Sequence, residues 1–315
     1  MQKRKIAVIG VGNMGKNHLR VYSQLPNVEI VGIADINIKL AKKIAKTYAT
    51  HYYRDYEELW KKEKPDAVSI VVPTLYHFDV ASFFLKNRVD TLLEKPIASN
   101  YKQAIRLINL SNKSGRFFTV GHIERFNPVV LKMKSLIKRG KVGEIIAISA
   151  KRVGLLPFNI VNSDVLIDIG IHDIDIANHI LEEFPKKITI RRSRNGNLNI
   201  VHAAEALIEY KNASALIQVN WLTPIKIRQL TVTGTKGYLE LDYISQTLTM
   251  YKLPKIPKSS SNGFENILMM QPVKVDIPVE KKEPLREELI AFLHRSKRCV
   301  SPKDAAKALK VCMRS

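Results

Sequence analysis

The chain has 315 residues, of which 45% are hydrophobic, 25% charged and 7% aromatic, with 14 glycines and 14 prolines. This composition is typical of a globular protein and excludes a largely disordered chain. At roughly 100–200 residues per domain, the length predicts two domains. No run approaches about 18 consecutive apolar residues, so we expect no membrane-spanning segment.

Positive charge is in excess, because 51 lysines and arginines face 29 aspartates and glutamates, a formal net charge of +22. The basic residues are spread along the whole chain, whereas nucleic-acid-binding proteins usually concentrate them on one face or arm. We interpret the two densest clusters, at residues 191–194 and 295–298, as exposed ends of secondary-structure elements. No nucleic-acid partner is therefore expected, and the positive field should favour small anionic ligands.

The cysteine content favours a cytoplasmic protein. There are two cysteines, Cys299 and Cys312, with no CxxC pair and no His/Cys spacing typical of a zinc site. The apolar run at residues 6–9, although basic residues precede it, is too short for the core of a signal peptide.

Between residue 5 and about residue 120, short β-branched apolar runs alternate with amphipathic stretches, which predicts repeated strand–helix units. The expected strands are 5–10, 29–34, 67–72, 91–94 and 117–121. The expected helices are 14–24, 38–48, 76–87 and 101–113. Continuous apolar strands are typical of a parallel sheet buried on both faces, and right-handed crossovers then give a doubly wound sheet. We predict a dinucleotide-binding Rossmann domain over residues 1–121.

After about residue 122 the pattern changes to longer runs with hairpin-like breaks. The expected helices are 128–139, 167–181, 285–297 and 303–313. The expected strands are 144–151, 187–192, 203–210, 213–221, 227–233, 237–241 and 247–252. Residues 254–263, rich in proline, serine and lysine, are expected to form an exposed loop. Antiparallel strands with helices on one face predict an α+β second domain, to which we assign residues 122–315.

A glycine-rich motif, GVGNMG, occupies residues 10–15, directly after the first expected strand and at the start of the first expected helix. Its first glycine permits a tight turn, its second lets the backbone approach a pyrophosphate, and its third allows close packing of helix on strand. The phosphates would lie against the N–H groups of the helix N-terminus. The cofactor-binding residues predicted here are Gly10, Gly12, Asn13, Met14 and Gly15.

The second expected strand leads to Asp35, 20 residues beyond Gly15, where a carboxylate should accept hydrogen bonds from the adenosine ribose. A carboxylate at this place repels a 2′-phosphate. No arginine occurs at residues 36–38, although Lys39 is near. We therefore predict NAD as the cofactor, with NADP less favoured.

Two further strand ends are expected to border the cofactor, because the carboxyl ends of parallel strands line the ligand crevice. The first carries Pro73 and Thr74, followed by His77, which either lies beside the cofactor or is a solvent-facing or capping histidine. The second carries Glu94 and Lys95. A lysine there is costly without a partner or a function, so Lys95 either pairs with Glu94 or hydrogen-bonds a reacting hydroxyl and stabilises its alkoxide. We predict that both residues contact the cofactor and that Lys95 is catalytic.

A second polar cluster begins at Asp168 and includes His172, four residues later and on the same face of an expected helix. The carboxylate can orient the imidazole, and a neutral imidazole can take a proton from an alcohol. A position near the helix start would favour the neutral form. Catalysis is favoured over a structural capping network and over a metal site including Asp175 and His179, because no HExxH-type pattern occurs. We expect no metal.

Three motifs in order, GVGNMG at 10–15, EKP at 94–96 and DxGxHD at 168–173, make the chain resemble the Gfo/Idh/MocA family of oxidoreductases over nearly its full length. The resemblance implies NAD(P)-dependent oxidation or reduction of a sugar or cyclitol without a metal. It also implies a second domain with an open, mostly antiparallel sheet that binds substrate and forms a homodimer or homotetramer. By position, Lys95 would bind the reacting hydroxyl, His172 would be the general acid/base, and Asp168 would hold the substrate or His172.

A narrower resemblance rests on VGHIERFNP at residues 120–128, which is similar to a subgroup of UDP-N-acetylglucosamine 3-dehydrogenases. It implies that Arg125 lies near the cofactor or the anionic part of the substrate. Residues 154–159, GLLPFN, depart from the Gly-Pro-rich segment with an arginine that this subgroup leads us to expect.

The leading hypothesis is NAD-dependent oxidation of a secondary hydroxyl of a nucleotide sugar such as UDP-N-acetylglucosamine. An inositol or free-sugar dehydrogenase is the alternative within the same class. An NAD-binding sensor or scaffold without turnover is an alternative of another class. The joint presence of Lys95, Asp168 and His172 argues against it, because a mere binder does not need all three.

Overall fold

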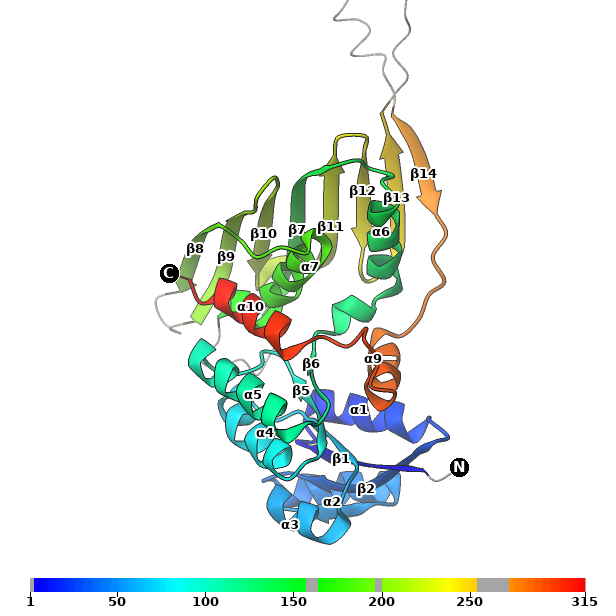
Figure 1. Cartoon of the computed structure of the whole chain (residues 1–315), viewed down its shortest axis with the longest axis vertical. Coiled ribbons are helices and arrows are strands. Elements are labelled where there is room, and N and C mark those ends of the chain that lie inside the picture. Colours follow the sequence, from blue (N-terminus) through cyan, green and yellow to red (C-terminus); the bar gives the residue numbers. More distant parts are fainter. Residues whose placement is uncertain (1–2, 157–163, 196–199, 254–271, 315) are drawn as a thin grey trace, which may run out of the picture. The chain divides into compact units, whose positions relative to one another are not determined.

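The computed structural model describes residues 3–156, 164–195, 200–253 and 272–314 (Figure 1). They form two compact units. The first unit comprises Met1–Phe126 and Glu283–Met313, and the second comprises Asn127–Lys282 and Arg314–Ser315. Among the helices of the described residues, none is long and apolar enough to cross a membrane.

The first unit contains a six-stranded parallel sheet in the order β3-β2-β1-β4-β5-β6. Its strands are β1 (Arg4–Ile9), β2 (Val28–Ala34), β3 (His51–Tyr53), β4 (Ala67–Ile70), β5 (Asp90–Glu94) and β6 (Phe118–Gly121). The strand order reverses between β1 and β4, the place where doubly wound sheets bind ligands at their carboxyl edge. The predicted Rossmann fold is confirmed.

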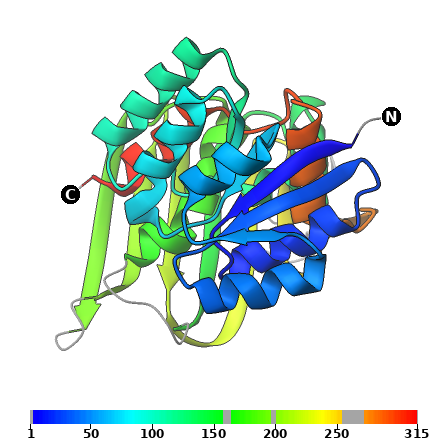
Figure 2. The same ribbon diagram turned by 90° about the horizontal axis from the view of Figure 1, so that it is seen from below.

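Helices cover both faces of this sheet (Figure 2). They are α1 (Asn13–Ser23), α2 (Ile38–Tyr48), α3 (Tyr56–Glu63), α4 (His77–Lys86), α5 (Tyr101–Ser114), α9 (Pro284–Leu293) and α10 (Pro302–Cys312), with short 3₁₀ helices η1 (Thr74–Tyr76) and η2 (Ile123–Phe126). Helix α9 packs on α1, and α10 packs on α5.

The two C-terminal helices therefore belong to the first unit, so the compact units differ from the expected domains of residues 1–121 and 122–315. The physical reason is burial of apolar surface. Leu289 and Phe292 of α9 join the same core as Leu19 and Tyr22 of α1, and all four side chains are fully buried.

The second unit contains an eight-stranded sheet in the order β14-β13-β12-β11-β7-β10-β9-β8, and every described pair of neighbours is antiparallel except β7 and β10. Its strands are β7 (Ile145–Leu155), β8 (Lys187–Asn195), β9 (Ile200–Glu209), β10 (Ser214–Asn220), β11 (Leu222–Gly234), β12 (Gly237–Asp242), β13 (Thr247–Lys252) and β14 (Val273–Ile277). The expected open, mostly antiparallel sheet is confirmed.

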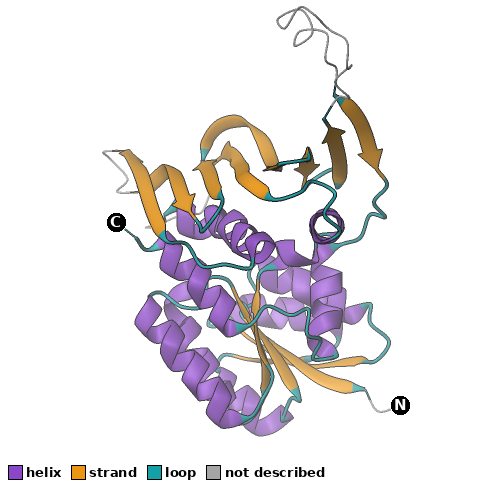
Figure 3. Cartoon of the chain, turned by 45° about the horizontal axis from the view of Figure 1, so that its top comes forward, coloured by secondary structure: helices purple, strands orange, loops and turns teal. Residues whose placement is uncertain are grey.

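One face of this sheet packs against α6 (Pro128–Lys138) and α7 (Ile171–Leu181), which contact β12 and β13, and β7 and β10, respectively (Figure 3). Side chains alternate accordingly: in β12 every second residue, beginning with Gly237, is buried. A π-helical turn, η3 (Leu166–Gly170), leads into α7.

Besides the short 3₁₀ helices η1 and η2, three elements were not expected: β3, α3 and β14. Strand β3 has three residues and buries only Tyr53, and α3 buries only Leu59, so neither produces an apolar period in the sequence. The loop expected at residues 254–263 lies outside the described residues.

Candidate functional site

The glycine-rich turn of the first unit is shaped by backbone contacts that only glycine permits. Gly10 has φ +90°, and a Cβ atom there would lie 2.6 Å from the carbonyl oxygen of Val71. A Cβ atom on Gly15 would lie 2.0 Å from the carbonyl oxygen of Gly10. Gly12 is the N-cap of α1 and faces open space, and no side chain caps the helix there. The first N–H groups of α1, including those of Asn13 and Met14, are thus left for an anion such as a pyrophosphate.

A cavity of about 680 Å³ opens beside this turn, at the carboxyl ends of β1, β2 and β4. Four of the predicted cofactor residues line it: Gly10, Gly12, Asp35 and Pro73. The other six do not. Asn13 and Met14 begin α1 beyond Gly12, Gly15 is buried, Thr74 begins η1, and Glu94 and Lys95 end β5 or follow it.

Asp35 is held by two backbone donors. Its Oδ2 accepts a hydrogen bond from the Val11 N–H at 2.9 Å, and its Oδ1 accepts one from the Asn37 N–H at 2.8 Å. A carboxylate oxygen can accept more than one hydrogen bond. The arrangement therefore ties the glycine-rich turn to the start of α2 and leaves acceptor capacity for ribose hydroxyls.

Arg54 also lines the cavity, with an exposed side chain, and it was not among the predicted residues. It follows β3, a strand too short to be read from the sequence. A guanidinium there can stack on a base or attract a phosphate. The aromatic ring of Tyr76 and the side chain of Ile36, which is 81% exposed, give the same cavity an apolar wall suited to a planar base.

The carboxylate of Glu94 points into the interior of the first unit. Its Oε1 lies 3.1 Å from Nε2 of the fully buried His18, and its Oε2 accepts a hydrogen bond from the backbone N–H of Lys95 at 3.1 Å. Burial by itself would raise the pKa of Glu94, but the hydrogen bond with His18 and the charge of Lys95 outweigh it and lower the pKa. Glu94 is thus an ionised buried group that holds the backbone at the half-buried Lys95.

His77 is buried, which rules out the solvent-facing interpretation. Its Nδ1 lies 2.7 Å from the carbonyl oxygen of Pro96, and its Nε2 lies 2.9 Å from that of Val72. Burial lowers the pKa of His77 although both carbonyl contacts oppose the shift. The ring links the cavity-lining segment after β4 to the segment that follows Lys95.

Glu288 of α9 is a buried acid that no sequence pattern indicated. It is 2% exposed, and neither of its carboxyl oxygens has a hydrogen-bond partner among the described residues. Burial raises the pKa of Glu288 well above its ordinary value, and the negative charge of Glu94 raises it further. Burial thus favours the protonated form of Glu288, whereas the pKa of Glu94 is lowered.

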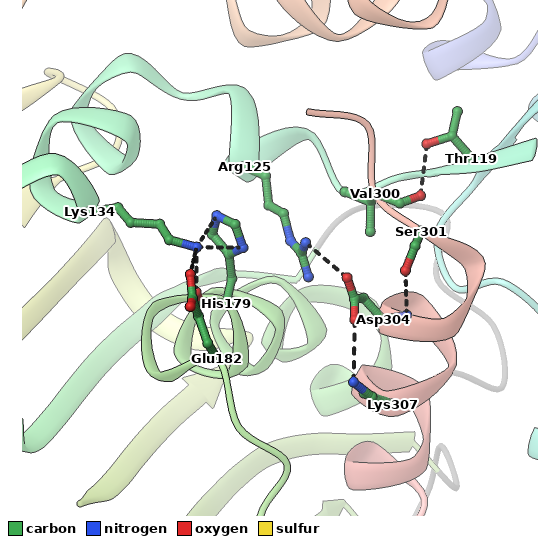
Figure 4. A network of polar contacts seen from close by, with 9 residues as sticks. All are labelled: Thr119, Arg125, Lys134, His179, Glu182, Val300, Ser301, Asp304 and Lys307. Carbon is green, nitrogen blue, oxygen red and sulfur yellow. Dashed lines mark hydrogen bonds and ion pairs between the residues drawn. The ribbon is translucent and has the colours of Figure 1, made fainter. Parts of the chain in front are cut away.

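Arg125 is 9% exposed and lies in η2. Its Nη1 is 3.5 Å from Oδ2 of Asp304, whose Oδ1 is 3.5 Å from Nζ of Lys307 (Figure 4). This ion pair connects η2 to α10 within the first unit. The structure thus gives Arg125 a structural contact, and its role toward a substrate stays a prediction.

In the second unit, Asp168 lies in the π-helical turn η3 and His172 in the first turn of α7. Both side chains are half-buried, so both keep access to solvent. The expected single helix from residue 167 is divided at Ile171, where the π turn gives way to α7. Such single π turns are frequent at functional sites.

Asp173, next to His172, forms a buried bidentate ion pair that was not foreseen. Its Oδ2 and Oδ1 accept hydrogen bonds from Nε and Nη2 of Arg152 at 2.6 and 3.0 Å. The guanidinium also lies 4.7 Å above the ring centre of Tyr243. The pair anchors the start of α7 to β7 and so orients the turn that carries His172.

The contacts of His179 do not favour the metal alternative. Nζ of Lys134 lies 3.2 Å from each ring nitrogen of His179 and donates to its carbonyl oxygen at 2.8 Å (Figure 4). Asp175 is 1% exposed. In the described part of the chain no three His, Cys, Asp or Glu residues are placed to hold a metal ion. That the reaction needs no metal stays a prediction.

Two family models match the chain. One, described as an oxidoreductase family with an NAD-binding Rossmann fold, matches residues 4–122, and the other, the GFO/IDH/MocA C-terminal domain, matches residues 130–240. Together they span more than half of the chain. The chain belongs to the Gfo/Idh/MocA family.

Similar proteins include two dehydrogenases. UDP-N-acetylglucosamine 3-dehydrogenase of Acidithiobacillus ferrooxidans is 28% identical over 249 residues, 78% of this chain and 76% of that protein. Inositol 2-dehydrogenase/D-chiro-inositol 3-dehydrogenase of Lactiplantibacillus plantarum is 25% identical over 261 residues, 78% of this chain and 73% of that protein. The solved structure of UDP-N-acetylglucosamine 3-dehydrogenase GnnA from Acidithiobacillus ferrooxidans has a TM-score of 0.85 at 22% identity, covering 99% of this chain and 96% of that one. The structural similarity establishes a shared fold.

Membership of this Gfo/Idh/MocA family confirms that the first unit binds NAD and that the protein is a dehydrogenase acting on CH–OH groups. The residues around the cavity fit this cofactor. Gly12 leaves the N-terminus of α1 accessible to the phosphates, and Asp35 places a carboxylate after the end of β2. The sensor or scaffold alternative is therefore not retained.

Proposed function

We propose that this dehydrogenase oxidises a secondary hydroxyl of a nucleotide sugar, namely the 3-hydroxyl of UDP-N-acetylglucosamine or a close analogue. The observation that carries the proposal is the similarity to a UDP-N-acetylglucosamine 3-dehydrogenase over 78% of this chain. The net charge of +22 is compatible with a substrate that carries two phosphates.

The proposal gives each predicted catalytic residue one task. Lys95 hydrogen-bonds the reacting hydroxyl and stabilises the developing alkoxide, and its half-buried position beside the ionised Glu94 supports this role. His172 takes the hydroxyl proton, and Asp168 orients His172 or the substrate. NAD held beside Gly12 and Asp35 would supply the hydride acceptor for the carbon that bears this hydroxyl. The products are a keto sugar, NADH and one proton, which His172 passes to water.

Arg125 is proposed to bind the anionic part of the substrate. A guanidinium carries five N–H donors in a planar fork that matches the geometry of a phosphate, and this chemistry supports the proposal.

An inositol or free-sugar dehydrogenase is the second candidate, and the similarity to the Lactiplantibacillus plantarum inositol dehydrogenase supports it. Part of the segment that departs from the nucleotide-sugar subgroup, residues 157–159, lies outside the described residues.

We also propose that the chain forms a homodimer or homotetramer through the face of the eight-stranded sheet opposite α6 and α7. Leu207 and Leu216 are directly paired across β9 and β10 and are 45% and 48% exposed, while their strand neighbours Ala206 and Ala215 are buried. The molar mass in solution, measured by light scattering, tests this proposal. A cytoplasmic location and the absence of a nucleic-acid partner remain predictions from the sequence.

The experiment that tests the function follows the absorbance of reduced nicotinamide with purified protein, NAD and either UDP-N-acetylglucosamine or myo-inositol. Each run is repeated with a 2-oxoacid, measuring loss of the oxoacid, in case the cofactor is recycled without leaving the protein. Turnover of the nucleotide sugar alone supports the proposal. Turnover of inositol alone contradicts it and favours the second candidate.

A further inference from the structure

A second cavity of the first unit, of about 460 Å³, is rich in basic side chains. Five cations line it, and the single carboxylate in its wall belongs to Asp66. The cations are Arg4, Lys64, Arg88, Arg116 and Arg295. No feature of the proposed dehydrogenase reaction uses this cavity, so its positive charge calls for a separate explanation.

The cavity lies at the amino edge of the parallel sheet, opposite the edge that carries the cofactor cavity. Arg4 begins β1 and Asp66 directly precedes β4, whereas Val71, at the other end of β4, lines the cofactor cavity. At about 3.3 Å per residue, the two ends of β4 are roughly 15 Å apart. Ligands can therefore occupy the two cavities at the same time.

Two of the arginines are held in place by one buried acid. Asp90, 1% exposed, accepts hydrogen bonds from Arg4 and, at 2.8 Å, from Nε of Arg295. Arg295 thereby keeps its terminal N–H groups for another partner. Arg88 and Arg116 have exposed side chains with no carboxylate partner among the described residues. Even with Asp90 counted, the charge around the cavity is +3.

The backbone at three of these cations is unusual. Lys64, Arg88 and Arg295 have φ of +47°, +59° and +49°, and they make up half of the six non-glycine residues with positive φ in the described part of the chain. Each follows the end of a helix, where glycine adopts this conformation at lower cost. Cations at helix C-termini do offset the helix dipole, but that effect does not require three of them to converge on one cavity.

We propose that this cavity binds a small oligophosphate anion, either free or as the phosphate chain of a nucleotide. Convergent arginines recognise phosphate through several charge-assisted hydrogen bonds. The cavity volume lies in the range of small-ligand sites, roughly 300–1,000 Å³. The inference does not depend on which sugar the enzyme oxidises.

The test is calorimetric titration of the full chain with tripolyphosphate at about 0.15 M salt, where the Debye length is about 8 Å, with saturating NAD present to occupy the cofactor cavity. The double variant Lys64→Asn/Arg88→Asn removes two cations, and asparagine tolerates positive φ, so the fold should be kept. Each lost charge-assisted contact, at about 1.5–3 kcal/mol, corresponds to roughly tenfold or more in affinity. We expect the double variant to bind at least about tenfold more weakly.

The matched control is Lys42→Gln/Lys43→Gln, which removes the same charge from exposed positions of α2 that do not line the cavity. Its affinity should stay within about twofold of the unchanged protein, because surface charges beyond the Debye length are screened. Equal weakening in both double variants, or no binding of tripolyphosphate to the unchanged protein at millimolar concentration, would overturn the proposal. A parallel titration with ATP separates the two sources: tighter binding than tripolyphosphate indicates a nucleotide, and equal binding indicates the phosphate chain alone.

Discussion

At the scale of single residues, the proposed function gives Lys95 and His172 separable tasks. Lys95→Ala and His172→Ala are each expected to lower turnover by at least about 100-fold, because each removes a positioned electrostatic or acid–base group. NAD affinity, measured by titration, should change little. Lys102→Ala, an exposed lysine in the first turn of α5, is the control for Lys95 and should keep normal turnover. Near-normal turnover of either alanine variant would remove the role assigned to that residue.

Asp35 is proposed to set cofactor choice through its charge and NAD affinity through its hydrogen bonds. Asp35→Ala is expected to weaken NAD binding by roughly tenfold and to narrow the preference over NADP, because it loses ribose acceptors and the backbone contacts to Val11 and Asn37. Asp35→Asn keeps one carbonyl acceptor for Val11 but removes the charge. It should therefore gain NADP binding with a smaller loss of NAD binding. If titrations show that both variants prefer NAD over NADP as strongly as the unchanged protein does, Asp35 does not bind the ribose.

Local sequence motifs predicted some of the individual residues that line the cofactor cavity. The place of Gly10, Gly12 and Asp35 beside the cavity could be predicted, because one turn and one strand end, within 25 residues of chain, determine it. That the Glu94 carboxylate points into the interior of the first unit could not be predicted, because its partner His18 is 76 residues away along the chain. Arg54 was missed because the strand before it is too short to show a period.

At the scale of elements, helix α9 places the carboxyl group of Glu288 in the interior of the first unit. The raised pKa of Glu288 means that the folded protein keeps a proton that the unfolded chain has lost above its ordinary pKa of about 4.5. The free energy of unfolding therefore falls as pH rises above that value, by up to about 1.4 kcal/mol per pH unit until the folded-state pKa is reached. Glutamine cannot lose this proton.

Glu288→Gln is thus expected to gain stability relative to the unchanged protein as pH rises from about 5 to 8, measured by denaturant unfolding at several pH values. Glu287→Gln, a change of the neighbouring carboxyl group on the same helix, separates the effect of burial from the loss of a carboxylate. A stability difference for Glu288→Gln that does not vary with pH would show that Glu288 is ionised in the folded protein.

The position of helix α7 could be predicted from the sequence, but the contacts that hold it against the sheet could not. The spacing from Asp168 to His172 predicted one helix with both residues on the same face, and the structure places Asp168 in η3 and His172 in the first turn of α7, both half-buried. The buried Arg152–Asp173 pair joins two elements whose pairing the sequence does not reveal. The π turn before α7 also has no local signature, because its backbone follows from how the turn packs.

For the whole molecule, the fold class was predictable and the division of the chain was not. Strand and helix periods, read in order, predicted a parallel sheet followed by a mostly antiparallel one. The return of residues 283–313 to the first unit could not be read, because an amphipathic helix does not show which apolar core it will join. The result is a first unit with cavities at both edges of one sheet, one for NAD and one rich in cations.

The most direct test of the account follows the hydrogen that leaves the sugar. The protein is mixed with NAD and UDP-N-acetylglucosamine that carries deuterium on carbon 3. The nicotinamide cofactor is then extracted with organic solvent, which recovers it whether or not the protein releases it, and its mass is measured against a run with unlabelled sugar. Transfer of one deuterium to the reduced cofactor is the predicted result. Reduced cofactor without deuterium, or a sugar that is not oxidised at all, would contradict the account.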